Sequence, residues 1–88
     1  MIVTPGELPA DDAVLNARGW KCPLPVLKAA KLLALAAPGE ILRVEATDAK
    51  SMEDFREWAG RDATVELLDQ REATDAGRSL FVHRVRRR

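Results

Sequence analysis

Four segments of the chain carry hydrophobic residues in a pattern that predicts β-strands, and in one of them these residues recur at every second position. The four segments cover residues 13–18, 40–47, 64–72 and 78–86. The alternation is clearest in the second, where Leu42, Val44 and Ala46 share one face while Arg43 and Glu45 lie on the other. The residues expected to fill the core from the other strands are Val14, Leu15, Val65, Leu67, Leu80, Phe81, Val82 and Val85. Residues 73–77 should connect the last two strands as a hairpin.

Two other segments carry hydrophobic residues at helical spacing. The first helix should start near Pro25 and end at Pro38-Gly39. Its expected buried face consists of Val26, Leu27, Ala30, Leu33 and Ala34. The second should start at Ser51, because Ser51 to Asp54 has the form of a capping box, and Gly60 should end it. Its expected buried stripe consists of Met52, Phe55 and Ala59, with Trp58 at the margin.

The resulting order, β-α-β-α-β-β, predicts an α/β protein with a two-layer sandwich architecture. Crossovers between parallel strands are right-handed, so two helices on the same face require both crossovers to step in one direction. The last strand can then fit antiparallel between the second and third strands, with the helices covering one face of a mixed four-stranded sheet. Residues 1–12 contain Pro5, Gly6 and Pro9 and no hydrophobic periodicity, which predicts a flexible N-terminal arm before a single domain at 13–88.

Composition excludes several classes of protein. The chain has 88 residues, which allows one small domain, and its 14 basic and 14 acidic residues cancel, unlike those of a dedicated nucleic-acid binder. A single cysteine excludes an internal disulfide framework and a cysteine-rich zinc site. Neither a signal peptide nor a membrane-spanning run is visible, so we expect a cytoplasmic protein.

The candidate chemistry lies at Cys22, where a strand ends and a helix begins. Arg18 and Lys21 precede this cysteine, and residues 13–39 contain no acidic residue. Because nearby cations and helix N-termini favour a thiolate, the sequence predicts an accessible thiol with a lowered pKa. Pro23 and Pro25 should stiffen the segment that presents the sulfur. Cys22 could instead be a buried packing residue, as a lone cysteine often is. A catalytic pair of Cys22 with His83, the one histidine, has little support in the sequence.

The segment from Leu15 to Lys28 includes Arg18-Gly19 and the Cys-Pro-x-Pro motif at residues 22–25. Together with a second block, Ala46-Thr47-Asp48 followed by Ser51, Glu53-Asp54 and Trp58, it resembles the signature of the TusA-type (SirA-like) sulfur carriers. The resemblance extends from about residue 15 to residue 86. Three positions depart from the family pattern: Asn16 replaces an Asp, Trp20 replaces a smaller apolar residue, and Ala49-Lys50 replaces Pro-Gly.

This resemblance implies a fold similar to the C-terminal domain of translation initiation factor 3, with strand order 1-2-4-3. It also implies that Cys22 carries sulfane sulfur as a persulfide, in the manner of a sulfurtransferase-type carrier rather than an enzyme that turns over alone. The residues implied to support Cys22 are Arg18, Gly19, Lys21, Pro23, Pro25 and Lys28. The implied partners are a cysteine desulfurase or another sulfane-sulfur donor, and an acceptor protein with a downstream thiol.

Sulfur relays of this kind serve tRNA 2-thiolation, molybdenum-cofactor biosynthesis or sulfur oxidation, and the sequence does not distinguish among them. We expect a monomer that needs no cofactor or metal and binds neither membrane nor nucleic acid directly. The first alternative is an RNA-binding module that uses Arg84, Arg86, Arg87 and Arg88 at the end of the chain. The second is a regulatory interaction module with an inert cysteine.

Overall fold

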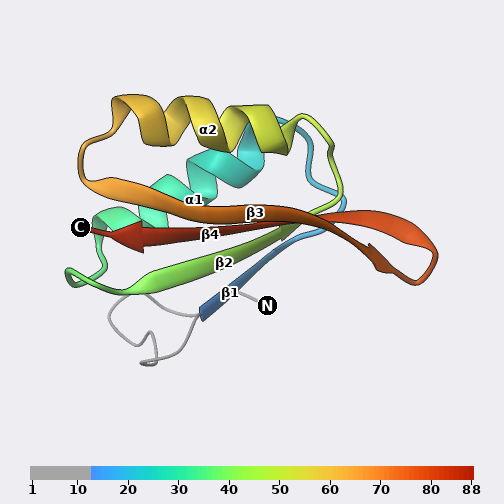
Figure 1. The fold of residues 1–88 in the computed structure, drawn as a ribbon, viewed down its shortest axis with the longest axis horizontal. Coiled ribbons are helices and arrows are strands. Elements are labelled where there is room, and N and C mark those ends of the chain that lie inside the picture. The colour runs from blue at the N-terminus through green and yellow to red at the C-terminus, as the bar shows by residue number, and fades with distance from the viewer. Residues whose placement is uncertain (1–12) are drawn as a thin grey trace.

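The computed structural model describes residues 13–88, so the arm predicted for residues 1–12 lies outside the described residues. Both helices lie side by side on one face of a four-stranded sheet (Figure 1). The elements are β1 (Ala13–Ala17), α1 (Leu24–Ala34), β2 (Ile41–Ala46), α2 (Ser51–Arg61), β3 (Val65–Asp75) and β4 (Arg78–Arg87). The predicted element order is therefore confirmed.

The sheet has the strand order β1-β2-β4-β3, as predicted. β1 pairs with β2 in parallel, whereas β4 lies antiparallel to both β2 and β3. The carboxyl ends of β1 and β2 therefore lie at the same end of the sheet, and the loops that lead into α1 and α2 meet there (Figure 1). The candidate site lies at this end of the sheet.

The core lies between the sheet and the two helices. Its sheet side alternates as predicted in β2, where Leu42, Val44 and Ala46 are buried. In β1 the buried residues are Ala13, Leu15 and Ala17, whereas Val14 is only half-buried. The helices contribute Val26, Ala29, Leu33, Phe55 and Trp58. Trp58 is thus a core residue rather than a marginal one.

The buried face of α1 differs from the predicted one. Leu27 was expected in the core, but 58% of it is exposed, and Ala34 is exposed as well. Ala29, which is fully buried, takes their place against the sheet. Val26, Ala29 and Leu33 form one stripe at i, i+3 and i+7, and Leu27 lies about 100° around the helix from Val26, so it faces solvent although it is a larger hydrophobe than Ala29.

The capping box predicted at the start of α2 is wrong. Ser51 lies inside the helix, and its hydroxyl contacts His83 Nε2 at 2.9 Å instead of capping the first turn. α2 also continues through Gly60 to Arg61. A buried histidine nitrogen needs a partner more than a solvent-exposed helix end does, because water can satisfy the helix end.

His83 is fully buried and sits at the centre of a polar cluster inside the core. The Gln70 amide Nε2 donates to the Met52 carbonyl at 2.8 Å and lies 3.0 Å from His83 Nδ1, so it donates to that nitrogen too. The imidazole must then be neutral with its proton on Nε2, where it donates to Ser51. Its ring stacks on Phe55 with centroids 4.3 Å apart. Burial lowers the pKa of His83 to about 4.

The hairpin between β3 and β4 is tighter than predicted. Only Ala76 and Gly77 form its turn, both with positive φ (52° and 78°), as in a two-residue turn of type I′. The strands are longer in return, and the hairpin extends past the end of β2, with which β4 pairs only over residues 81–86 (Figure 1). The register between β3 and β4 shifts after Leu67, where Leu68 forms a bulge.

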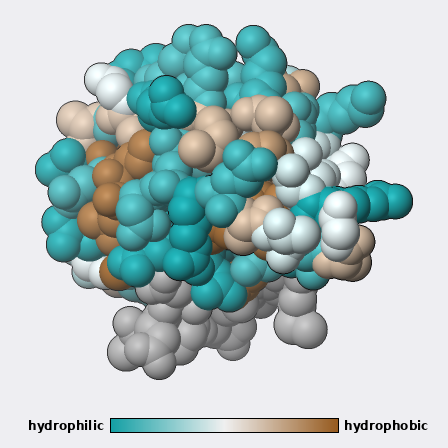
Figure 2. Space-filling model, turned by 45° about the vertical axis from the view of Figure 1, so that its right-hand side comes forward, coloured by the Kyte–Doolittle hydropathy of each residue, from teal (hydrophilic) through white to brown (hydrophobic). Residues whose placement is uncertain are grey.

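Hydrophilic side chains cover most of the side of the molecule that Figure 2 shows, and hydrophobic groups are gathered in smaller patches between them. The large hydrophobic residues that are most exposed are Leu24, Leu27 and Leu35. No helix among residues 13–88 is both long and apolar enough to cross a membrane.

Candidate functional site

Cys22 lies in the loop between β1 and α1, at the edge where the two parallel strands end. The chain turns at Gly19, which has a φ of +80° that other residues rarely adopt. The Gly19 amide donates to Thr47 Oγ1 at 2.9 Å, and the Cys22 amide donates to Asp48 Oδ2 at 2.9 Å. The loop after β2 therefore holds the cysteine loop in place through two side-chain acceptors.

The cysteine itself is half-buried, two residues before α1 begins. Its thiol donates a hydrogen bond to Asp54 Oδ2 in the first turn of α2. Three segments distant in sequence thus meet at Cys22: its own loop after β1, Asp48 after β2, which accepts from its amide, and Asp54 on α2, which accepts from its thiol.

The electrostatics of Cys22 differ from the prediction. The hydrogen bond to Asp54, partial burial and the negative charge of Asp54 raise the pKa of the Cys22 thiol above its ordinary value, while the positive charge of Lys50 opposes them. The prediction of a lowered pKa is therefore wrong. It considered only acids that are near in sequence, whereas the fold brings Asp54 to the sulfur from 32 residues away.

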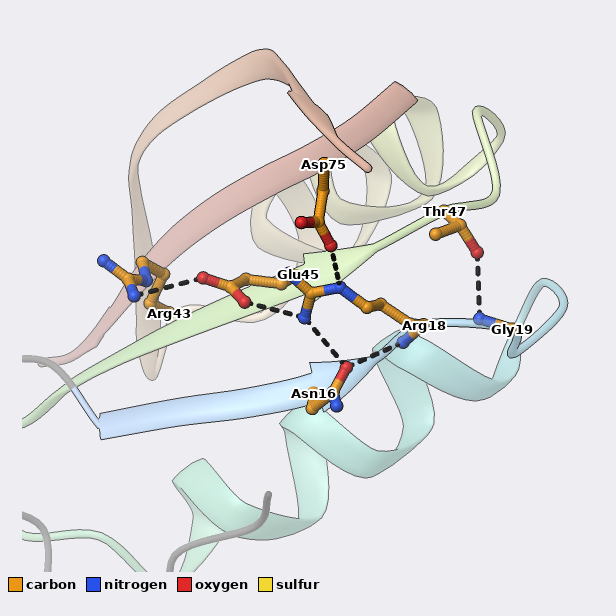
Figure 3. A network of polar contacts seen from close by, with 7 residues as sticks. All are labelled: Asn16, Arg18, Gly19, Arg43, Glu45, Thr47 and Asp75. Atoms are coloured by element: carbon orange, nitrogen blue, oxygen red, sulfur yellow. Dashed lines mark hydrogen bonds and ion pairs between the residues drawn. The ribbon is translucent and has the colours of Figure 1, made fainter. Parts of the chain in front are cut away.

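Arg18 does not act on the cysteine directly. Figure 3 shows its guanidinium between Glu45 and Asp75, with which it forms ion pairs at 2.8 Å each. Asn16 Oδ1 accepts from the Arg18 amide at 3.2 Å and from its guanidinium at 3.0 Å. Arg18 thus ties the end of β1 to β2 and to the tip of the hairpin, and these acids raise its own pKa.

The other predicted residues fall into two groups. Pro23 and Lys21 flank the sulfur, both exposed, and the Cys22–Pro23 peptide bond is cis. Pro25 is buried in the first turn of α1, where it anchors the cysteine loop to the core. Lys28 is exposed one turn further along α1.

A hollow of about 270 Å³ adjoins the cysteine loop. It is lined by Gly19, Trp20, Lys21, Thr47 and Asp48. Trp20 is half-buried and packs against the core cluster, so the ring that departs from the family pattern forms a wall of this hollow. The hollow is open to solvent, and its lining is mostly polar.

Asp48 and Asp54 are the two site residues that reasoning from the cysteine segment missed. Asp48 accepts from the amides of Cys22 and Lys50, and these bonds lower its pKa. Both acids do lie in the second sequence block, Thr47-Asp48 to Glu53-Asp54, so that block gave a signal for them. A contact with the sulfur could only be seen in the folded chain.

Comparison with known proteins agrees with this geometry. The family model for the sulfurtransferase TusA matches residues 13–85, which include both helices and nearly all of the sheet. This chain belongs to the TusA family. The match covers the whole cysteine loop and both acids that contact it.

Individual relatives support the same assignment. The sulfur carrier protein TusA of Allochromatium vinosum is 41% identical over 61 residues, which cover 69% of this chain and 79% of the relative. A Halobacterium salinarum protein whose name assigns it a sulfur carrier role is 44% identical over 73 residues, or 83% of this chain and 85% of the relative. YrkI of Bacillus subtilis, named in the same way, is 36% identical over 66 residues, or 75% and 83% of the two chains. The family and these names support a sulfur carrier role.

Proposed function

We propose that this chain accepts sulfane sulfur as a persulfide on Cys22 and passes it to a cysteine of an acceptor protein. One observation carries the proposal. The single cysteine of the chain lies half-buried in the loop between β1 and α1, beside an open hollow, and hydrogen bonds fix both its amide and its thiol. A packing cysteine would lie inside the core, and Cys22 does not belong to the core cluster.

The transfer needs no oxidant, because the sulfur that moves stays at the same oxidation level. The Cys22 thiolate attacks the outer sulfur of a donor persulfide, and the S–S bond of the donor breaks. The donor cysteine leaves as a thiolate and takes up a proton, while a new S–S bond forms on Cys22. A second exchange of the same kind moves the outer sulfur to the acceptor cysteine and returns Cys22 to its thiol form.

The persulfide form of Cys22, which we call the loaded state, is long-lived because the sequence has no second cysteine to react with it. A persulfide next to another thiol of the same chain would be lost by forming a disulfide, but this sequence contains one cysteine. The persulfide must therefore wait for an external thiol. A cysteine desulfurase is the donor that we propose.

The arginines at the end of the chain favour this function over RNA binding. Arg86 forms an ion pair with Glu66, and Arg84 lies 3.5 Å from Asp69. Arg87 and Arg88 donate to backbone carbonyls of neighbouring residues. All four guanidinium groups are thus engaged within the fold, and the charges of Arg84 and Arg86 are offset by carboxylates, whereas phosphate binding needs free basic groups.

The test is the gain of one sulfur atom. Incubated with a cysteine desulfurase and cysteine, the wild-type chain should gain the mass of one sulfur atom in an intact-mass measurement, and a reductant should remove it. The Cys22→Ser variant should fold and gain nothing. A gain of mass in that variant, or none in the wild type with several donors, would contradict the proposal.

A further inference from the structure

The environment of Cys22 is unusual for a cysteine that must attack another sulfur. Reactive cysteines generally lie among positive groups that stabilise the thiolate. Here the thiol donates its hydrogen to a carboxylate, Asp54, and the amide of the same residue donates to a second carboxylate, Asp48. The unloaded site is therefore arranged to keep the proton on the sulfur.

This contact is built into the fold rather than made by two free side chains. Asp54 directly precedes Phe55, which is fully buried, and its own amide donates to the Lys50 carbonyl at 3.0 Å. On the other side, the hydrogen bond between the Cys22 amide and Asp48 fixes the cysteine backbone. The first turn of α2 therefore positions Asp54, and the loop after β2 positions the backbone of Cys22.

Among the described residues, Cys22 is the only hydrogen-bond partner of the Asp54 carboxylate. Asp48 differs, because its two oxygens accept from the amides of Cys22 and Lys50. A positive group brought by another molecule could therefore pair with Asp54 more readily than with Asp48. Glu53, the exposed neighbour of Asp54 in the first turn of α2, adds negative charge to the same end of the helix.

We infer that Asp54 locks the unloaded carrier in its protonated, unreactive thiol form, and that a donor releases the lock by placing a basic side chain against this carboxylate. The inference rests on the proposed function, since it describes how Cys22 becomes an acceptor of sulfur. Once a cation pairs with Asp54, the thiol loses its hydrogen-bond acceptor and its negative neighbour. The proton passes to solvent, and the thiolate attacks the donor persulfide.

The other charged groups around the sulfur do not replace Asp54. Lys50, just before α2, favours the thiolate, and Asp48 disfavours it more weakly than Asp54 does. Lys21 acts on Asp48, whose pKa it helps to lower. His83 is buried with both ring nitrogens occupied by Ser51 and Gln70, so it is not available as a base for Cys22.

The first experiment measures the thiol pKa from the rate of alkylation by iodoacetamide as a function of pH. Asp54→Asn should lower the pKa and raise the rate at pH 7 severalfold. The matched control is Glu53→Gln, which removes the same charge from the adjacent exposed residue and should leave the pKa close to that of the wild type. Asp54→Ser, a second variant that is compatible with a helix first turn, should act like Asp54→Asn.

The second experiment tests the release by a cation with two disulfides of opposite charge, cystamine and dithiodiglycolate. The negative charge of Asp54, roughly 5 Å from the charged end of a reagent in water, should raise the exchange rate of the cationic cystamine by about fourfold. It should lower that of the anionic dithiodiglycolate by about the same factor. The ratio of the cystamine rate to the dithiodiglycolate rate should therefore fall by about tenfold in Asp54→Asn, after screening by salt. It should change little in Glu53→Gln.

An unchanged thiol pKa in both Asp54 variants would overturn the lock. A lower pKa with an unchanged rate ratio would overturn the release by a cation. Neither experiment uses sulfane sulfur, so a failure of the lock and a failure of persulfide transfer remain distinguishable.

Discussion

Acidification should destabilise this protein through one residue, His83. The imidazole is neutral in the folded chain for two reasons. It is buried, and Gln70 donates to its Nδ1, so a proton added to Nδ1 would face a donor instead of an acceptor. Its pKa is about 4 in the folded chain, whereas an unfolded histidine has a pKa of about 6.5. Between these values the unfolded chain binds more protons, so the free energy of unfolding falls as pH decreases.

The two pKa values set the magnitude. Full stability is present above the unfolded pKa, and the loss grows as the pH falls from about 6.5 towards 4. Between pH 7.5 and 4.5 the contribution of His83 to the free energy of unfolding should fall by about 2.5 kcal/mol. That is a large share of the stability of a small domain, which is about 5–10 kcal/mol.

Urea unfolding of the wild type and of His83→Gln, each at pH 7.5 and 4.5, isolates this effect. Glutamine cannot titrate, so the variant should be less stable at pH 7.5 but lose about 2.5 kcal/mol less on acidification. Groups common to both chains, such as Asp48 and Asp62, whose pKa values are lowered, cancel in the difference. An equal loss in both chains would refute the assignment of a buried, neutral His83.

Three further predictions concern single positions. Arg18→Ala should lower the free energy of unfolding by about 1 kcal/mol or less, because its ion pairs are partly exposed. It should leave the alkylation rate of Cys22 unchanged, because the charges that act on the thiol are those of Asp54, Lys50 and Asp48. Lys50→Gln should slow alkylation at pH 7, because the positive charge of Lys50 favours the thiolate; faster alkylation would contradict this. Ala76→Asn should raise the free energy of unfolding by about 0.5–1 kcal/mol in urea, because asparagine accepts the positive φ before Gly77 more readily; no gain would contradict it.

The fold could be predicted from the sequence because local periodicity and chain connectivity together leave few solutions. Strand alternation, two helical stretches and right-handed crossovers allow the order β1-β2-β4-β3, and the family resemblance implies that same order. The phase of α1 could not be predicted in the same way. Leu27 and Ala29 are both hydrophobic, so the sequence permits two neighbouring stripes, and the packed helix buries the one that contains Val26, Ala29 and Leu33.

The site was predictable only in part, for a related reason. Cys22 could be found because its proline-flanked position is a local feature of the sequence. The ionisation of its thiol depends on Asp54, and that of Arg18 on Glu45 and Asp75, all of which are distant in sequence. Charges act through space, so a count of charges along the cysteine segment gave the wrong direction for the pKa.

The bulge in β3 bears on how copies of this chain behave at high concentration. β3 is an edge strand of 11 residues, and a long edge with unpaired backbone groups can pair with the edge of another molecule. Leu68 interrupts the regular pattern of those groups, and Glu66, Asp69, Arg71 and Glu72 place charges along the strand. Two copies that meet edge to edge therefore face mismatched hydrogen bonds and must bury charge, which opposes aggregation through the sheet.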